Sequence, residues 1–128
     1  MNYPWLEEYM LAKPGASKDY KAEWDWHLYL VGGKMFASVF RPPEKYDPAY
    51  AGKDLISLKC DPMMAEFLRE QHPEVIPGFY CDKRHWNSVD LGGSLPDDAL
   101  RQMIDDSYRL VFEKLIKKLQ KEILDAAD

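Results

Sequence analysis

The amino-acid sequence predicts an α+β domain of two layers, in which three helices pack on a five-stranded antiparallel sheet. Three observations lead to this prediction. Helical and strand patterns follow one another in the order α-β(3)-α-β(2)-α, glycine pairs typical of hairpin turns close the strand patterns, and no repeat or linker interrupts the 128 residues. That length is typical of one domain with a core of its own. We therefore expect residues 1–128 to form a single domain with its helices collected on one face of the sheet.

The first helix is expected over residues 3–12. Asn2 stands near its cap, Pro4 falls in its first turn, and Glu7-Glu8 come early in the helix. These residue types suit the free N–H groups and the positive dipole at the start of a helix. Pro14-Gly15 then ends the helix.

Residues 20–30 are expected to form one long strand, because apolar and polar side chains alternate there. Its apolar, aromatic-rich face carries Tyr20, Ala22, Trp24, Trp26, Leu28 and Leu30. Gly32-Gly33 then suits a tight hairpin turn, and residues 34–40 form the returning strand. Both faces of that strand are apolar, so it should lie inside the sheet or be covered on both sides. The prolines of residues 41–53 indicate a loop, and residues 54–60 are the third strand.

The second half of the chain predicts a helix, two short strands and a long final helix. Asp61 caps the helix over residues 62–71, with a proline at its first position. The two strands are expected around residues 78–82 and 86–91. The final helix begins near Pro96. Its apolar stripe runs at three- and four-residue spacing through Leu100, Ile104, Tyr108, Val111, Leu115, Leu119 and Ile123. Lysines near its end would complement the helix dipole.

Composition narrows the classes of function. Apolar residues make up 46% and charged residues 30%, as in ordinary globular domains. The chain has no apolar run long enough for a membrane helix and no secretion signal at its start, so we expect a cytoplasmic protein with no membrane partner. The net charge of −5 counts against nucleic-acid binding, because such domains are usually basic. A local basic patch can still bind DNA against that field.

No residues predict catalysis, a metal or a cofactor, and we expect the chain not to be an enzyme. The sequence contains no GxSxG, GxxxxGK[ST] or GxGxxG motif. His27 is expected to face solvent and His72 to end a helix, which leaves Cys81 and His85 as the nearest approach to a metal pair. Cys60 and Cys81 are the only cysteines. In a reducing compartment a disulfide between them is disfavoured, so we expect two buried thiols that act as small hydrophobic groups.

The segment Lys83-Arg84-His85-Trp86-Asn87 is the one candidate binding site. Cations beside an aromatic ring suit a phosphate backbone with a stacked base. Lys34 and Lys59, each near a strand end, would extend the patch. The other interpretation is structural: Trp86 packs in the core, and Lys83 and Arg84 solubilise a turn.

A series of short motifs spans nearly the whole chain. In order they are Lys13-Pro14-Gly15, Gly33-Lys34-Met35-Phe36-Ala37, Leu58-Lys59-Cys60-Asp61-Pro62, Val75-Ile76-Pro77-Gly78-Phe79-Tyr80, Lys83-Arg84-His85-Trp86-Asn87-Ser88-Val89, Leu95-Pro96-Asp97-Asp98 and Asp106-Ser107-Tyr108. With this order and spacing the chain resembles the MmcQ/YjbR family of small bacterial proteins. The proline-rich loop at residues 42–53 is an elaboration of that pattern.

The resemblance implies the same α-β(3)-α-β(2)-α order and a DNA-binding role through a so-called double-wing surface. Carried over by position, the DNA-binding residues would be Lys34, Lys59, Lys83, Arg84, His85 and Trp86. A second hypothesis is a protein-interaction module without nucleic-acid binding, since the fold class also resembles that of secretion chaperones. An acidic surface suits such a module, and exposed sheet or helix faces would bind the polypeptide.

Overall fold

The structure, a computed structural model, describes residues 2–45, 47–79 and 81–127. Within them six strands form one antiparallel sheet in the order β1-β2-β3-β4-β6-β5. The strands are β1 (Ala16–Lys21), β2 (Trp26–Val31), β3 (Lys34–Phe40), β4 (Leu55–Lys59), β5 (Val75–Pro77) and β6 (Trp86–Asp90). The helices are α1 (Leu6–Leu11), α2 (Pro62–Gln71), α3 (Asp97–Phe112) and α4 (Lys117–Ala127). The predicted α+β class is confirmed, with one more strand than expected.

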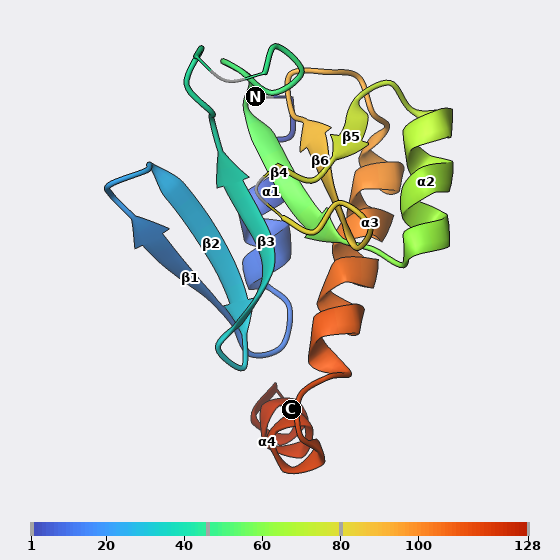
Figure 1. The fold of residues 1–128 in the computed structure, drawn as a ribbon. Coiled ribbons are helices and arrows are strands. Elements are labelled where there is room, and N and C mark those ends of the chain that lie inside the picture. The colour runs from blue at the N-terminus through green and yellow to red at the C-terminus, as the bar shows by residue number, and fades with distance from the viewer. Residues whose placement is uncertain (1, 46, 80, 128) are drawn as a thin grey trace.

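The main core lies between the sheet and the two helices α1 and α3, which cover the same face (Figure 1). Phe36, Ile56 and Ile104 are fully buried there. On the other face, Phe40, Leu55 and Phe79 form a smaller cluster with half-buried Trp26 and other side chains. As predicted, β3 lies inside the sheet, between β2 and β4. Apolar residues on both of its faces are therefore needed, because each face meets a cluster.

Residues 20–30 are not one strand, as the alternating pattern predicted, but the end of β1, a turn and most of β2. β1 ends at Lys21, residues 22–25 turn, and β2 begins at Trp26. Asp25 adopts a left-handed conformation with φ 53°, and Trp24 N–H donates to the Lys21 carbonyl at 3.1 Å. The prediction failed because the turn keeps the same polar and apolar alternation as the strands, so period two shows no interruption.

The strand predicted at residues 78–82 is also wrong, since β5 occupies Val75–Pro77. Gly78 N–H still donates to the Trp86 carbonyl at 3.0 Å, and the chain then leaves the sheet. β5 is an edge strand, which is where a proline can be tolerated because one side of the ladder needs no N–H. Residue 80 lies outside the described residues. The strand predicted at 86–91 is confirmed as β6.

The predicted long final helix is two helices, because the helical conformation stops after Phe112 and resumes at Lys117. Gln120 Nε2 donates to the free carbonyls of Glu113 and Leu115, at 3.2 and 2.7 Å, which stabilises the break. The apolar stripe continues through it because Leu115 and Leu119 pack against Gly32 in the turn between β2 and β3. Lysines predicted to complement one helix end lie instead in this turn and in the first half of α4.

The first helix is shorter than predicted, because α1 begins at Leu6 without a side-chain cap and Asn2 donates to the Gly93 carbonyl instead. Three other local predictions agree with the structure. Gly32 and Gly33 form the hairpin turn with φ 57° and 77°, which glycine adopts without strain. The Asp61 carboxylate caps α2 by accepting the Met63 N–H at 3.0 Å. Residues 41–53 contain no strand within their described part. None of the described helices is long and apolar enough to cross a bilayer.

Candidate functional site

One end of the sheet gathers three of the predicted site residues. β3 starts there with Lys34, β4 ends there with Lys59, and β6 starts there with Trp86 (Figure 1). Lys59 and Trp86 are direct partners across the β4–β6 ladder. We call this region, with Lys34, Lys59, Arg84 and Lys114, the basic end of the sheet. It places Lys59 across the ladder from Trp86, whose side chain is neither sealed in the core nor fully exposed.

Lys59 and Lys114 come close enough at the basic end to influence each other. Partial burial lowers the pKa of Lys59 first, and the positive charge of Lys114 lowers it further. Asp82 opposes this effect with its negative charge. Lys114 belongs to the turn after α3, so the break that ends that helix brings this second lysine to β4. Like charges held together in this way favour an anion between or beside them.

Asp82 organises the segment that follows it. Its carboxylate accepts the Arg84 N–H at 3.0 Å and contacts His85 Nδ1 at 2.7 Å, while its carbonyl accepts the His85 N–H at 3.1 Å. These contacts lower the pKa of Asp82, mainly through the Arg84 N–H and then the histidine. The His85 carbonyl in turn accepts the Cys60 N–H at 2.7 Å, which fastens the turn to the end of β4.

Arg69 of α2 fixes the same segment from the other side. Its Nε donates to the Asn87 Oδ1 at 2.7 Å, and its Nη2 donates to the carbonyls of Lys83 and Trp86. Asn87 is fully buried and donates onward to the Ala65 carbonyl at 3.2 Å. Two side chains thus connect α2 to β6 and hold the loop before β6 in one conformation.

The six predicted residues do not all present free charge. Lys83 Nζ donates to the Gly78 carbonyl at 2.8 Å and lies 5.7 Å from the centre of the Tyr50 ring. His85 is paired with Asp82. Lys34, Lys83 and Arg84 are exposed, whereas Lys59, His85 and Trp86 are half-buried. Lys83 and His85 thus have partners within the loop, and Trp86 is only half-buried instead of packed in the core, as the structural interpretation required. The site hypothesis is best carried by the other four residues.

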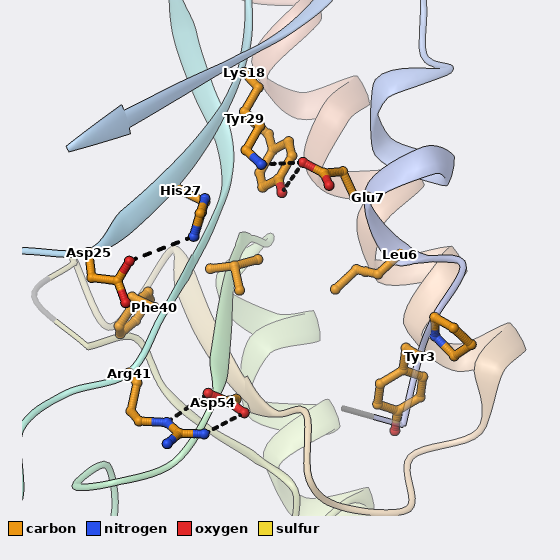
Figure 2. A pocket seen from close by; sticks show the side chains of 12 residues that line it. Tyr3, Leu6, Glu7, Lys18, Asp25, His27, Tyr29, Phe40, Arg41 and Asp54 are labelled. Atoms are coloured by element: carbon orange, nitrogen blue, oxygen red, sulfur yellow. Dashed lines mark hydrogen bonds and ion pairs between the residues drawn. The ribbon is translucent and has the colours of Figure 1, made fainter. Parts of the chain in front are cut away.

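A separate cavity of about 560 Å³ lies between α1 and the strands β1, β2 and β3 (Figure 2). Its charges form pairs: Lys18 with Glu7, and Arg41 with Asp54 through two bonds of 2.8 and 2.9 Å. The pKa of Glu7 is lowered chiefly by its bond from Lys18, and that of Asp54 by its bond from Arg41. In both pairs a cation and a carboxylate that line the cavity neutralise each other, and Asp25 adds a further carboxylate to the lining.

His27 also lines this cavity, which corrects the prediction that it faces solvent. Its ring packs on Tyr20 with 4.7 Å between centroids, and its Nε2 lies 3.9 Å from Asp25 Oδ1. The prediction placed His27 on the polar face of one long strand. In the hairpin that face turns toward α1, so the histidine becomes half-buried.

The two cysteines are free thiols, with Cys60 buried and Cys81 partly buried. Burial raises the pKa of Cys60 to about 11 and also raises that of Cys81. Thiols with raised pKa values are poor nucleophiles at neutral pH. Within the described part of the chain, no three histidine, cysteine or acidic side chains come together in a way that could hold a metal ion.

The family model YjbR matches residues 11–110. The chain belongs to the YjbR family. Among curated relatives, YjbR of Escherichia coli K12 is 35% identical over 116 residues, which cover 91% of this chain and 92% of that protein. YbdF of Escherichia coli O157:H7 is 32% identical over 101 residues, covering 77% and 75%.

Solved structures of two bacterial proteins share the fold. Deinococcus radiodurans protein DR2400 superposes with a TM-score of 0.77 at 29% identity, covering 92% of this chain and 84% of that one. A Pseudomonas syringae protein gives a TM-score of 0.74 at 26% identity, covering 87% and 99%. The YjbR fold therefore extends over most of the chain, and Lys34, Lys59, Arg84 and Trp86 lie within the residues that the family model matches, whereas Lys114 follows them.

Sequence reasoning missed Arg69, Asn87 as its partner, and Lys114. Arg69 and Lys114 were ordinary helix cations in the sequence, and nothing local linked them to the segment before β6. The only available signal was the side of α2 on which Arg69 falls, four residues after the fully buried Ala65. That spacing places Arg69 next to the sheet rather than in solvent.

Proposed function

We propose that this YjbR-family chain is a binding protein rather than an enzyme, and that it binds DNA through the basic end of its sheet. The proposal rests on one observation, that Lys59 feels the positive charge of Lys114 and is the cross-strand partner of half-buried Trp86. Two ammonium groups near an aromatic ring can contact adjacent phosphates and pack on the sugar or base between them. Exposed Lys34 and Arg84 extend the same surface.

Lys83 and His85 have a different role in this proposal. Lys83 braces the loop through the Gly78 carbonyl, and His85 through Asp82, so both hold Arg84 and Trp86 in place. The net charge of −5 repels DNA at long range. Binding is therefore expected to be local, of low affinity and without strong sequence preference, because phosphate contacts carry no sequence information.

Removing the lysine pair should weaken duplex binding at every sequence tested. Lys59→Ala with Lys114→Ala is expected to reduce the slope of log affinity against log salt by about two, one for each lost phosphate contact. The control is Lys21→Ala with Lys121→Ala, which changes the net charge equally but removes lysines paired with Asp19 and Asp125. Fluorescence anisotropy with a labelled duplex over a salt series measures the affinity and its salt dependence for both double variants.

Two results would contradict DNA binding at this end. One is the absence of any anisotropy change at low salt with micromolar wild-type protein. The other is an equal loss for both double variants, since the effect would then follow net charge instead of the proposed surface.

A second candidate function, polypeptide binding, is supported by the outer face of α2. Met63 is 83% exposed, Phe67 52% and Met64 45%, all within the first six residues of α2. Methionine adapts its shape to different apolar partners, and neighbouring exposed apolar residues commonly mark protein contact sites. A chaperone-like module would use such a face to hold an unfolded segment.

This candidate predicts that the wild-type chain slows the aggregation of a chemically denatured model protein at equimolar ratio. Met63→Lys with Phe67→Lys should remove the effect, because each lysine places a charge on the apolar face. Leu124→Lys is the control, since Leu124 is 50% exposed on α4, away from this face. Light scattering records the aggregation. If the wild type gives no protection, polypeptide holding is excluded.

A further inference from the structure

A second surface feature lies at the other end of β3 from Lys34. The turn at residues 22–25, between β1 and β2, and the proline-rich loop after β3 enclose a cavity of about 780 Å³. We call it the tryptophan slot. Trp24 and Trp26 line it from the hairpin, Pro42 and Pro43 line it from the loop, and Phe79 contributes from the segment after β5. It is distinct from the basic end, because the length of β3 separates them.

The two indoles of the slot form a corner. Their ring centroids are 6.4 Å apart, with planes inclined at 64°. Trp26 also packs on Phe40, with 4.7 Å between centroids and 32° between planes, so the smaller cluster fixes its orientation. Trp24 is 64% exposed. A large aromatic side chain left in water on an ordered turn offers a ring face that a ligand can cover.

Carboxylates stand directly beside this corner. Glu23 and Asp25 flank Trp24 in the sequence, and both line the slot. Tyr20 O–H donates to Asp25 Oδ1 at 2.7 Å, which holds that carboxylate in place. Two cations also line the slot, but the Arg41 guanidinium is neutralised by Asp54 through two hydrogen bonds. Lys45 is the other cation, with a contact of its own.

We propose that the tryptophan slot binds a weakly hydrated organic cation, either a guanidinium or a quaternary ammonium group. The negative faces of two inclined indoles attract such a cation, and nearby carboxylates add to the attraction. A compact, strongly hydrated ammonium would lose more of its hydration there. A phosphate-bearing ligand would meet Glu23 and Asp25 and be repelled, so this surface does not continue the DNA site.

The test is a titration followed by NMR of the Trp24 and Trp26 indole N–H signals, using choline and arginine amide as probes. We expect both signals to shift with dissociation constants in the millimolar range. The neutral isosteres 3,3-dimethylbutanol and citrulline amide should bind at least about tenfold more weakly, because they keep the shape and lose the charge. The dissociation constant of a peptide with one arginine is compared with that of free arginine amide. Tighter binding of the peptide indicates a protein partner, and equal binding indicates a small molecule.

Variants locate the site. Trp24→Ala is expected to weaken choline binding at least about tenfold, with the Trp26 signal as readout, and Glu23→Gln a few-fold. Both changes are at exposed positions, so the fold should be kept. Glu70→Gln, at an exposed position on α2, is the matched charge control and should not change choline binding. The proposal is overturned by equal binding of the neutral isosteres, by stronger binding of nucleoside monophosphates, or by unshifted indole signals.

Discussion

Phe36→Ala is expected to lower the free energy of unfolding by about 3–5 kcal/mol, the range for removing a buried phenylalanine. Phe36 is fully buried, and its ring meets the edge of Tyr108 with 5.4 Å between centroids. It lies where the β2–β3 register shifts, between the partners of Tyr29 and Leu30. The cavity left by alanine would lie between β3 and α3 and could collapse little, since strands on both sides hold the backbone in place.

Urea denaturation measures this loss, and Phe67→Ala is the matched control. Phe67 is 52% exposed on α2, so the same substitution should change stability by only about 0.5 kcal/mol. Equal losses for the two variants would mean that the position of Phe36 between sheet and helix is wrong.

Arg69→Ala is expected to cost about 2–4 kcal/mol and to free the loop before β6. The change removes hydrogen bonds to Asn87, Lys83 and Trp86 and leaves the buried Asn87 oxygen without its donor. Arg69→Lys should recover only part of the loss, because a single ammonium cannot reproduce the planar guanidinium fork. Denaturation gives the stability, and hydrogen exchange of the Cys60 N–H, which donates to the His85 carbonyl, reports on the loop.

Two controls separate this network from the loss of a surface charge. Arg109→Ala removes an exposed arginine whose ion pairs join its own helical neighbours, and it should cost less than about 1 kcal/mol. The double variant Arg69→Ala with Asn87→Ala should lose less than the sum of the single variants, since each removes the same bond. Additive losses would contradict a direct Arg69–Asn87 interaction.

Much of the fold followed from local chemistry. The cap and proline at Asp61-Pro62 gave the start of α2, and the Gly32-Gly33 pair gave the hairpin between β2 and β3, because few other residues suit those backbone conformations. The doubly apolar pattern of residues 34–40 correctly predicted an interior strand. The family resemblance is confirmed by the match of the YjbR model to residues 11–110.

The errors share one physical cause, which is that a periodic pattern can continue through a change of direction. The turn at residues 22–25 kept the alternation of a strand, and the break after Phe112 kept the stripe of a helix. At the helix break Leu115 is buried like the stripe before it, whereas at residues 22–25 the apolar side chains Tyr20 and Trp24 keep the alternation although they are exposed. The turn residues themselves lack a strong glycine or proline signal.

The candidate site was only partly predictable for a related reason. Lys59 and Trp86 were expected near one another because both lie at strand ends, and the ladder pairs them. Whether Lys83 and His85 carry free charge depends on the Gly78 carbonyl and on Asp82, whose positions follow from the loop conformation. Lys114 could not be assigned to the site because its approach depends on where α3 ends.

The sequence by itself determined the α+β class, the family and the starts and turns of several elements, since these depend on side-chain polarity and on the backbone preferences of glycine, proline and aspartate. Only the tertiary structure decided which charges remain available at the basic end and that Trp24 and Trp26 form a corner beside two carboxylates. Those features depend on distances between segments far apart in the chain. Such distances are set by packing of the whole domain, which no local pattern records.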